Sequence, residues 1–188
     1  MPTSALQVWP AMVHLCWEVK PRRILDIGPG HGKAGILLRE YIGTVAAGTG
    51  PIERVDAIEA EPRYLKRFRW LESVYDRVMV GDACELSQDA LDCYDLVLMA
   101  DVIEHLDYRQ ASALLERICG HVVISTPADF FQNPEADDFP SERHRSHWSA
   151  ADFGSRVERL DADALKQLGC VLVRLSERAR PATPPPSP

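Results

Sequence analysis

The sequence predicts an α/β protein built on a single doubly wound, Rossmann-like open sheet that is mostly parallel. Three observations lead to this fold class. Short apolar runs of strand length alternate with segments of helical pattern. Glycines gather directly after the first apolar run, and acidic residues stand at the ends of the next ones. The chain of 188 residues has room for one domain with a sizeable core, which we expect over residues 1–178.

The N-terminal part supplies the first helix and strand. Residues 4–19 show apolar side chains near helical spacing, and Pro10 is expected to restrict or kink that helix. A buried strand is predicted at 24–27, and a helix opens after the glycines with HGKAGILLREYIG. The glycine content of residues 43–53 predicts a loop.

The rest of the chain continues the alternation. Further strands are predicted at 54–60, 78–81, 94–100 and 121–127, with helices through 62–73 and 108–118. Because strands and helices alternate, these strands should run parallel. A polar loop up to residue 148 is then followed by a short helix at 149–153, a strand-like segment at 155–160 and a strand at 170–177. We expect the last strand to be antiparallel, and the Pro-rich residues 179–188 to form a disordered tail.

The overall composition limits the class of protein. No apolar run reaches the ~18 residues of a membrane span. Five dispersed cysteines without a C-x-x-C pair indicate reduced thiols, and the N-terminus lacks a secretory pattern, so we expect a cytoplasmic protein. A net charge of −7 argues against broad binding to nucleic acid, but not against a local basic patch. The oligomeric state stays open.

The stretch ILDIGPGHGKAG, which ends at Gly35, fits three kinds of nucleotide loop to different degrees. A phosphate-binding P-loop requires G-x-x-x-x-G-K-[ST], but Ala34 follows Lys33 and the first glycine is missing. A dinucleotide fold requires G-x-G-x-x-G directly after the strand, and the register from Gly30 to Gly35 begins too late for that. Both alternatives are therefore poorer matches than the third.

The third pattern is D-x-G-x-G-x-G, and Asp26, Gly28, Gly30 and Gly32 satisfy its four positions. This segment resembles the first motif of the class I S-adenosylmethionine-dependent methyltransferases. In that family the loop backbone passes beside the methionine part of the cofactor, and the acid contacts its ammonium group. Glycines permit such a close approach, and a carboxylate facing a cation is electrostatically favourable.

Later segments extend the resemblance over residues 22–127. Glu59 closes the second strand, where the family places an acid that accepts both ribose hydroxyls, although Glu61 lies nearby. Asp82 matches the acid that receives the adenine amino group, and Ala83 is then expected beside the ring. Taken singly, such acids are more often helix caps or turn formers. Their joint placement at successive strand ends is what favours a cofactor site.

The segment YDLVLMADVIEHL resembles the family's fourth motif and supplies candidates for the chemistry. We expect Asp101 at the cofactor, and Asp101, Glu104 and His105 in catalysis. Methyl transfer is an in-line displacement, and a hydroxyl acceptor must also lose its proton. His105 is the preferred base because imidazole titrates near neutral pH, but a packing histidine that caps the next helix fits equally well.

The loop after the fifth strand is expected to cover the acceptor. Its residues 133–153 resemble those of small stand-alone bacterial methyltransferases, with Phe130 and Phe131 as further candidate walls. The predicted acceptor-binding residues are Arg143, His144, Arg145 and Trp148. The arginines suit a phosphate or carboxylate, whereas Trp148 is expected mainly to pin the loop to the core.

A metal site is a further hypothesis. Its candidate ligands, a mixed oxygen and nitrogen set suited to manganese, iron or zinc, are Asp101, Glu104, His105 and His144. The set resembles that of the metal-dependent small-RNA 3′-end 2′-O-methyltransferases, which carry E-x-x-E-H, V-I-S-T-P and a histidine four residues before a tryptophan. Asp101 replaces the first glutamate, and we expect no additional RNA-holding domain. A divalent metal is therefore not favoured.

The sequence thus predicts an S-adenosylmethionine-dependent methyltransferase that releases S-adenosylhomocysteine. Its expected acceptor is a small molecule or a sugar-containing compound, methylated at oxygen. Two alternatives stay open: a metal-dependent RNA 2′-O-methyltransferase, and a cofactor-binding module that has lost catalysis and acts through a partner.

Overall fold

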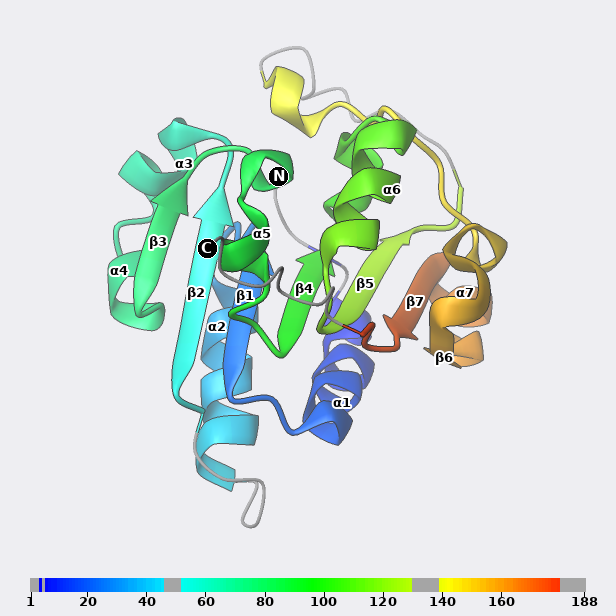
Figure 1. Cartoon of the computed structure of the whole chain (residues 1–188), viewed down its shortest axis with the longest axis horizontal. Helices are drawn as coiled ribbons and strands as arrows, with labels where there is room; N and C mark the ends of the chain where they lie inside the picture. The colour runs from blue at the N-terminus through cyan, green and yellow to red at the C-terminus, as the bar shows by residue number, and fades with distance from the viewer. Residues whose placement is uncertain (1–3, 5, 46–51, 130–138, 180–188) are drawn as a thin grey trace, which may run out of the picture.

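The protein folds around one seven-stranded sheet with the strand order β3-β2-β1-β4-β5-β7-β6 (Figure 1). The computed structural model describes residue 4 and residues 6–45, 52–129 and 139–179. The strands are β1 (Arg23–Ile27), β2 (Arg54–Glu59), β3 (Arg77–Val80), β4 (Leu96–Ala100), β5 (His121–Pro127), β6 (Val157–Leu160) and β7 (Cys170–Leu175). The first five strands are parallel, and β7 runs antiparallel to both β5 and β6. The predicted α/β class, the mostly parallel sheet and the antiparallel last strand are confirmed.

Helices connect these strands. They are α1 (Trp9–Val19), α2 (Lys33–Leu38), α3 (Pro62–Arg67), α4 (Leu71–Val74), α5 (Gln88–Leu91), α6 (Tyr108–Arg117) and α7 (Ala162–Leu168). Shorter helical turns are η1 (Leu6–Val8), η3 (Ala83–Glu85), η4 (Ile103–His105), η6 (Pro140–Glu142) and η7 (Ala150–Arg156), and α2 continues into the π-helical η2 (Arg39–Val45). The predicted tail from 180 onward and the residues Phe130, Phe131, Asn133 and Pro134 lie outside the described residues.

Three helical predictions need correction. The expected single helix at 62–73 is two helices, because the backbone of Phe68 leaves the helical region with φ −112° and ψ 60°. Pro10 does not kink α1, since it lies in the first turn, where its missing N–H leaves no bond unmade. The helices α5 and α7 were not predicted at all; each is short and begins at a side-chain cap, Ser87 and Asp161 respectively.

Two apolar layers hold the helices on opposite faces of the sheet. In β4, Leu96 and Leu98 belong to the core layer beneath α1 and α2, whereas Val97 and Met99 belong to the layer beneath α5 and α6. Successive residues of a strand point to opposite faces, so a run of apolar residues fills both layers. This explains why the central strands read as continuously hydrophobic in the sequence.

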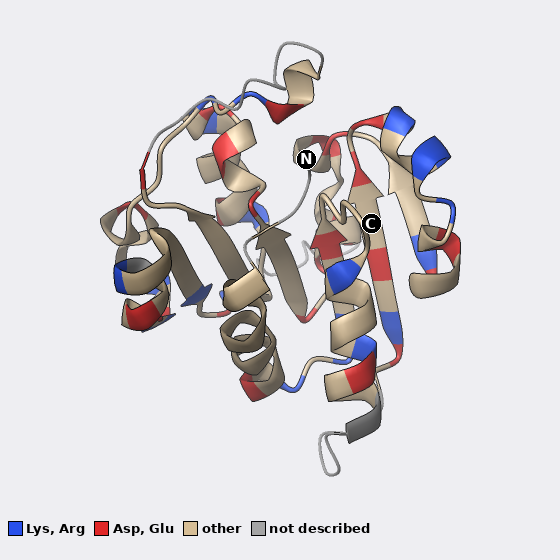
Figure 2. Cartoon of the chain, turned by 180° about the vertical axis from the view of Figure 1, so that it is seen from behind, with Lys and Arg blue, Asp and Glu red and all other residues tan. Residues whose placement is uncertain are grey.

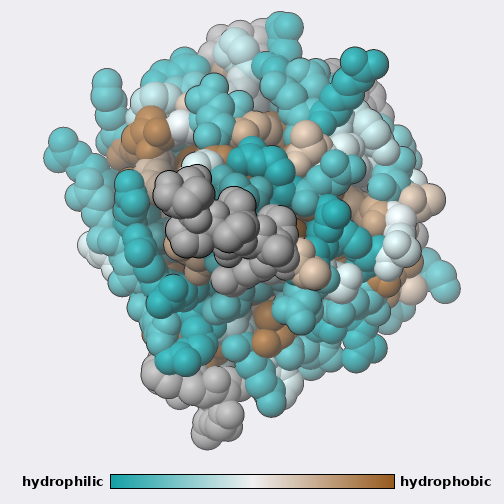
Figure 3. All heavy atoms as spheres, viewed as in Figure 1, coloured by the Kyte–Doolittle hydropathy of each residue, from teal (hydrophilic) through white to brown (hydrophobic). Residues whose placement is uncertain are grey.

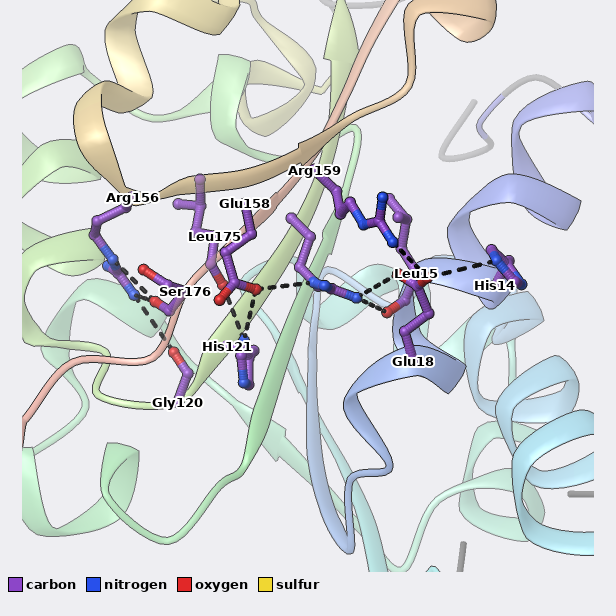
Figure 4. Close-up of polar contacts among 11 residues, drawn as sticks. His14, Leu15, Glu18, Gly120, His121, Arg156, Glu158, Arg159, Leu175 and Ser176 are labelled. Carbon is purple, nitrogen blue, oxygen red and sulfur yellow. Dashed lines mark hydrogen bonds and ion pairs between the residues drawn. The ribbon is translucent and has the colours of Figure 1, made fainter. Parts of the chain in front are cut away.

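An ionic network fastens α1 to the antiparallel edge of the sheet (Figure 4). The guanidinium of Arg174 on β7 lies 2.6 Å from a carboxylate oxygen of Glu18 and 3.1 Å from one of Glu158. It also donates to the carbonyl of Leu15. Arg159 on β6 reaches the same Glu18 at 3.1 Å. The network lies near the amino end of β5, since Arg174 is in register with Val123.

The surface is predominantly polar. Seen from behind, Lys and Arg are dispersed among Asp and Glu over the elements instead of forming one block (Figure 2). The opposite face is mostly hydrophilic, with hydrophobic residues scattered across it (Figure 3). Among the described residues, none of the helices has the length and the apolar character that crossing a membrane requires.

Candidate active site

A cavity of about 470 Å³ opens at the carboxyl ends of the parallel strands. It lies where the chain order of the sheet reverses, between β1 and β4, the place at which ligands of open α/β sheets bind. Five predicted site acids line it: Asp26, Glu59, Asp82, Asp101 and Glu104. Residues that are far apart in the sequence are therefore brought to one cavity by the sheet topology.

The glycine loop after β1 passes close to the end of β4. Gly28 adopts φ +68°, and its N–H donates to the carbonyl of Ile58 at 2.9 Å. A Cβ at Gly28 would stand 2.6 Å from Cγ2 of Val102, so both the conformation and the space require glycine. Gly30 and Gly32 also have positive φ. Only Gly28 of the three lines the cavity; the other two shape the turn.

Asp26 is buried at the bottom of the cavity. Its carboxylate accepts a hydrogen bond of 2.5 Å from the hydroxyl of Tyr75. Burial, with a smaller contribution from Glu59, raises the pKa of Asp26 to about 7, although the bond from Tyr75 lowers it. The side chain is thus poised between its neutral and ionised forms near neutral pH.

Glu59 and Glu61, the two candidates for the ribose acid, have different surroundings. Glu59 is buried, lines the cavity and accepts the N–H of Glu61 at 2.8 Å. Its burial raises the pKa of Glu59 to about 7. Glu61 caps α3 and forms two side-chain bonds of 2.7 Å to Arg63, and these bonds lower its pKa to about 2. Only Glu59 is therefore available to a ligand in the cavity.

Asp82 and Ala83 follow β3 and also line the cavity. The carboxylate of Asp82 accepts the N–H of Cys84 at 2.8 Å and caps η3. Asp82 can therefore cap η3 and face a ligand in the cavity from the same position. Ala83 is buried and offers a small apolar surface.

Asp101 occupies a strained position at the end of β4. It has φ +54°, which is uncommon for a residue with a side chain. Its N–H donates to the carbonyl of Ser125 at 2.9 Å, and its Oδ1 accepts the hydroxyl of Ser125 at 2.8 Å. Two bonds to β5 hold this conformation, and they keep the Asp101 carboxylate at the cavity wall.

Glu104, His105 and His144 form a cluster on the other side of the cavity. One potential ligand atom from each lies within 4.8 Å of the other two. Glu104 is buried and accepts the hydroxyl of Thr126 at 3.0 Å, and burial together with Asp101 raises its pKa to about 8. The two imidazole rings meet edge to face, with their centroids 5.0 Å apart. Asp101 is not part of this cluster.

The segment after β5, described over residues 139–148 and called the covering segment below, places the remaining predicted residues differently. The N–H of Arg145 donates to the carbonyl of Glu104 at 2.7 Å, and Arg145 lines the cavity. Arg143 is exposed and does not line it. Trp148 is 1% exposed, stacks on Tyr108 at 4.5 Å between centroids and lies outside the cavity wall. Trp148 thus pins the segment to the core, and an acceptor contact of its ring is not supported.

Sequence reasoning missed several residues of the wall. Tyr64 on α3 donates to Glu142 of the covering segment at 2.9 Å, and both line the cavity. Ser4, Trp9 and Lys33 line it as well. Ser4, Trp9 and Tyr64 belong to no motif named above, and only the folding of α1, α3 and the covering segment over the sheet brings them there. For Lys33, the available signal in the sequence was its position directly after Gly32 in the glycine-rich stretch.

The match to a protein-family model shows to which family the chain belongs. A model described as a methyltransferase domain matches residues 6–168, which is most of the chain. The chain belongs to this methyltransferase family. A search of curated proteins finds no match. The methyltransferase uses S-adenosylmethionine as its cofactor, and the predicted family, enzyme class and cofactor are confirmed.

Solved structures share the fold of the methyltransferase at low sequence identity. A proposed O-methyltransferase from Nostoc punctiforme is 20% identical with a TM-score of 0.58; the alignment covers 90% of this chain but only 56% of that one. The N-terminal domain of EvdMO1, determined with S-adenosylhomocysteine and D-fucose, is 16% identical with a TM-score of 0.60 and coverages of 94% and 85%. The methyltransferase domain of bacterial CtHen1 is 17% identical, with a TM-score of 0.57 and coverages of 92% and 98%.

Proposed function

We propose that this methyltransferase transfers the methyl group to an oxygen atom of a small-molecule or sugar-containing acceptor in the cytoplasm. The observation that carries the proposal is the division of the cavity. Acids at the ends of β1, β2 and β3 form one group of wall residues, and an imidazole cluster from η4 and the covering segment forms another. The five cysteines are all free thiols, in keeping with a reducing compartment.

The cofactor half of the cavity has a suitable donor and acceptor for each part of S-adenosylmethionine. Asp26 would accept from the ammonium group beside the Gly28 loop. Glu59 would accept the two ribose hydroxyls, and Asp82 the adenine amino group, with Ala83 beside the ring. The order of these acids along β1, β2 and β3 supports this placement because the three strands are neighbours in the sheet.

His105 is the proposed general base. Its Nδ1 lies 3.2 Å from the carbonyl oxygen of Arg143, and a carbonyl can only accept, so Nδ1 must donate. In the neutral ring the other nitrogen, Nε2, is then unprotonated and able to take a proton from a hydroxyl. This supports oxygen as the target atom, since an amine acceptor can react as the free base without such a group.

Similarity supports a sugar-containing acceptor. The fold is shared with a domain whose structure was determined with D-fucose. Arg145 lines the same cavity as His105 and offers a donor for an acidic or hydroxylated acceptor.

The test is a transfer assay with methyl-labelled S-adenosylmethionine and a panel of deoxysugars and other small hydroxyl compounds, in the presence of a chelator. We expect an O-methyl product, identified by NMR, and a fall in kcat of about 100-fold or more in His105→Gln with an unchanged KM for the cofactor. His14→Gln, an exposed histidine on α1, is the control. Transfer to nitrogen or carbon, or full activity of His105→Gln, would contradict the proposal.

A second candidate is a metal-assisted 2′-O-methyltransferase acting on RNA. It is favoured by the one specific observation that Glu104, His105 and His144 come together. Two imidazoles and a carboxylate fit manganese, iron or zinc, and such a metal would polarise the acceptor hydroxyl. The expected fourth ligand, Asp101, bonds Ser125 instead. Titration with Mn²⁺ distinguishes the two candidates. If Mn²⁺ does not bind, the metal-assisted candidate is removed. Tight binding that is lost in His144→Ala, together with Mn²⁺-dependent methylation of an RNA 3′ end, would replace the first proposal.

A further inference from the structure

Among the described residues that precede β1, two buried hydrogen-bonding side chains beside the cavity have no partner. Ser4 is 5% exposed and Trp9 is 7% exposed, and both line the cavity wall. Within the part of the chain that the structure describes, neither Oγ of Ser4 nor Nε1 of Trp9 makes a hydrogen bond. A buried donor without an acceptor destabilises the fold, so paired groups are the rule in folded proteins. Two such groups facing one cavity therefore indicate a ligand that completes them.

A cation stands beside these groups. Lys33, at the start of α2, lines the same cavity, and its Nζ lies 5.6 Å from the centroid of the Trp9 ring. An indole N–H and an ammonium group only donate, and a serine hydroxyl can donate as well. Three donors with one positive charge select an anion, and a planar carboxylate can accept from several donors at once.

The position of these three donors in the fold indicates which carboxylate they bind. Trp9 and Ala34, the neighbour of Lys33, belong to the same core layer as Tyr75, the partner of Asp26. The donors thus come from the side of the sheet on which Asp26 is held, whereas the imidazole cluster is built by η4 and the covering segment. In S-adenosylmethionine the α-carboxylate and the ammonium group share one carbon atom, so their binding groups must be neighbours.

We propose that Ser4, Trp9 and Lys33 bind the α-carboxylate of the cofactor, while Asp26 holds the ammonium group. This inference rests on the cofactor and on the proposed role of Asp26, but not on the nature of the acceptor. The segment before β1 thereby becomes part of the binding site, and the cofactor ties α1 to the glycine loop. An acid group on the acceptor would offer the same chemistry, and the experiment below distinguishes the two sources.

The test compares two ligands that differ only in the amino-acid part. Calorimetry measures the Kd of S-adenosylhomocysteine and of 5′-methylthioadenosine, which keeps the adenosine and the sulfur but lacks the carboxylate. We expect Trp9→Phe and Ser4→Ala each to weaken S-adenosylhomocysteine about tenfold and to leave 5′-methylthioadenosine unchanged. Trp17→Phe, at an exposed tryptophan of the same helix, is the matched control and should change neither.

Each other outcome overturns the inference. Unchanged binding of S-adenosylhomocysteine in both variants would mean that the donors serve a different anion, such as one on the acceptor. An equal loss for both ligands would reveal a packing role. If Trp9→Phe does not fold, the wild-type protein still decides through the indole N–H signals of its four tryptophans. The signal of one tryptophan must shift when S-adenosylhomocysteine is added but not when 5′-methylthioadenosine is added. If the two ligands cause the same shifts, the proposal is refuted. Binding of 5′-methylthioadenosine would show that the protein recognises the adenosine part of the cofactor, and this result does not depend on the acceptor assay.

Discussion

Tyr75 bonds Asp26 across 2.5 Å, and the oxygen that donates this bond also accepts the backbone N–H of Gly35 at 3.2 Å. A Cβ at Gly35 would lie 2.7 Å from the Tyr75 ring. The glycine at this position of α2 therefore makes room for the ring of Tyr75. The result is a buried carboxyl with one fixed partner. Its raised pKa leaves it ready to ionise when a cation arrives.

Asp26→Asn should increase stability while it weakens cofactor binding. The pKa of Asp26 in the folded protein, about 7, exceeds the ordinary value of 3.8, so folding disfavours the ionised form. The carboxylate therefore costs stability as the pH rises from about 4 to 7, and the full cost applies above pH 7. At pH 8 we expect Asp26→Asn to raise the free energy of unfolding by about 1–3 kcal/mol, measured by denaturant titration.

The contrasting variant is Asp76→Asn. The pKa of Asp76 is lowered by the N–H of Val55 and by Arg39, so this carboxylate stabilises the fold when it is ionised. Its loss should lower the stability at pH 8. A decrease for both variants would contradict the assigned state of Asp26.

Cofactor affinity should depend on pH. Both Asp26 and Glu59 have a pKa of about 7, and in the proposed complex both accept hydrogen bonds from the cofactor as carboxylates. Below pH 7, each must first lose a proton, so the affinity for S-adenosylhomocysteine should fall by up to tenfold per pH unit for each group. Calorimetry between pH 5.5 and 8 measures this. 5′-Methylthioadenosine lacks the ammonium group and should show the shallower slope of Glu59 alone; equal slopes would count against the role of Asp26.

The two glutamates after β2 can be separated by mutation. Glu59→Gln should weaken S-adenosylhomocysteine at least tenfold, about 1.4 kcal/mol, because the ribose loses a charged acceptor. Asp82→Ala should have a similar effect at the adenine end. Glu61→Gln removes only a helix cap that is paired with Arg63, so its Kd should stay within about twofold. A larger effect of Glu61→Gln than of Glu59→Gln would reverse the assignment.

The glycine loop offers a test of steric fit. Gly28→Ala combines a left-handed backbone with a Cβ only 2.6 Å from Val102. We expect loss of cofactor binding and a destabilisation that exceeds the ~1–2 kcal/mol of left-handed strain. Gly169→Ala is the matched control, since its φ is +59° and nothing lies within 4 Å of the added Cβ. Val102→Ala in the Gly28→Ala background should restore part of the stability; no rescue would mean that the strain alone matters.

Arg174 should contribute more to stability than Arg159, although both contact Glu18. The Arg174 side chain is 12% exposed and satisfies two carboxylates, whereas that of Arg159 is 59% exposed. We expect Arg174→Met to cost about 1–3 kcal/mol of unfolding free energy, because Glu18 and Glu158 lose their most buried cation and keep only the more exposed Arg159 and His121. Arg159→Met should cost less than about 0.5 kcal/mol. Equal effects would show that shielding from water does not matter in this network.

The elements of the sheet were predictable because each central strand is an apolar run that fills two core layers. The acids at the strand ends were predictable for a related reason. Parallel strands end at the same edge, so Asp26, Glu59 and Asp82 meet once the sheet forms. The break at Phe68 and the short helices α5 and α7 were not predictable, because local capping and packing decide them and no periodic pattern spans so few residues.

The acceptor side shows where sequence reasoning ends. The E-H pair of the fourth motif and His144 did come together, but Asp101 turned away from them to bond Ser125. Whether a side chain at a strand end faces a ligand or a neighbouring strand depends on one backbone dihedral, here a φ of +54°. Aspartate is enriched at positive φ among residues with a side chain, but most aspartates adopt other conformations, so the residue type alone does not predict it.

The antiparallel edge has a consequence for how this enzyme can change. The ionic network that anchors it lies near the start of β5, while the covering segment leaves from the other end of that strand. Mutations in the covering segment would leave this network and the acids at the ends of β1 to β3 in place. The fold therefore separates the strand-end acids from the segment proposed to contact the acceptor, and directed evolution of acceptor preference should concentrate on residues 139–148.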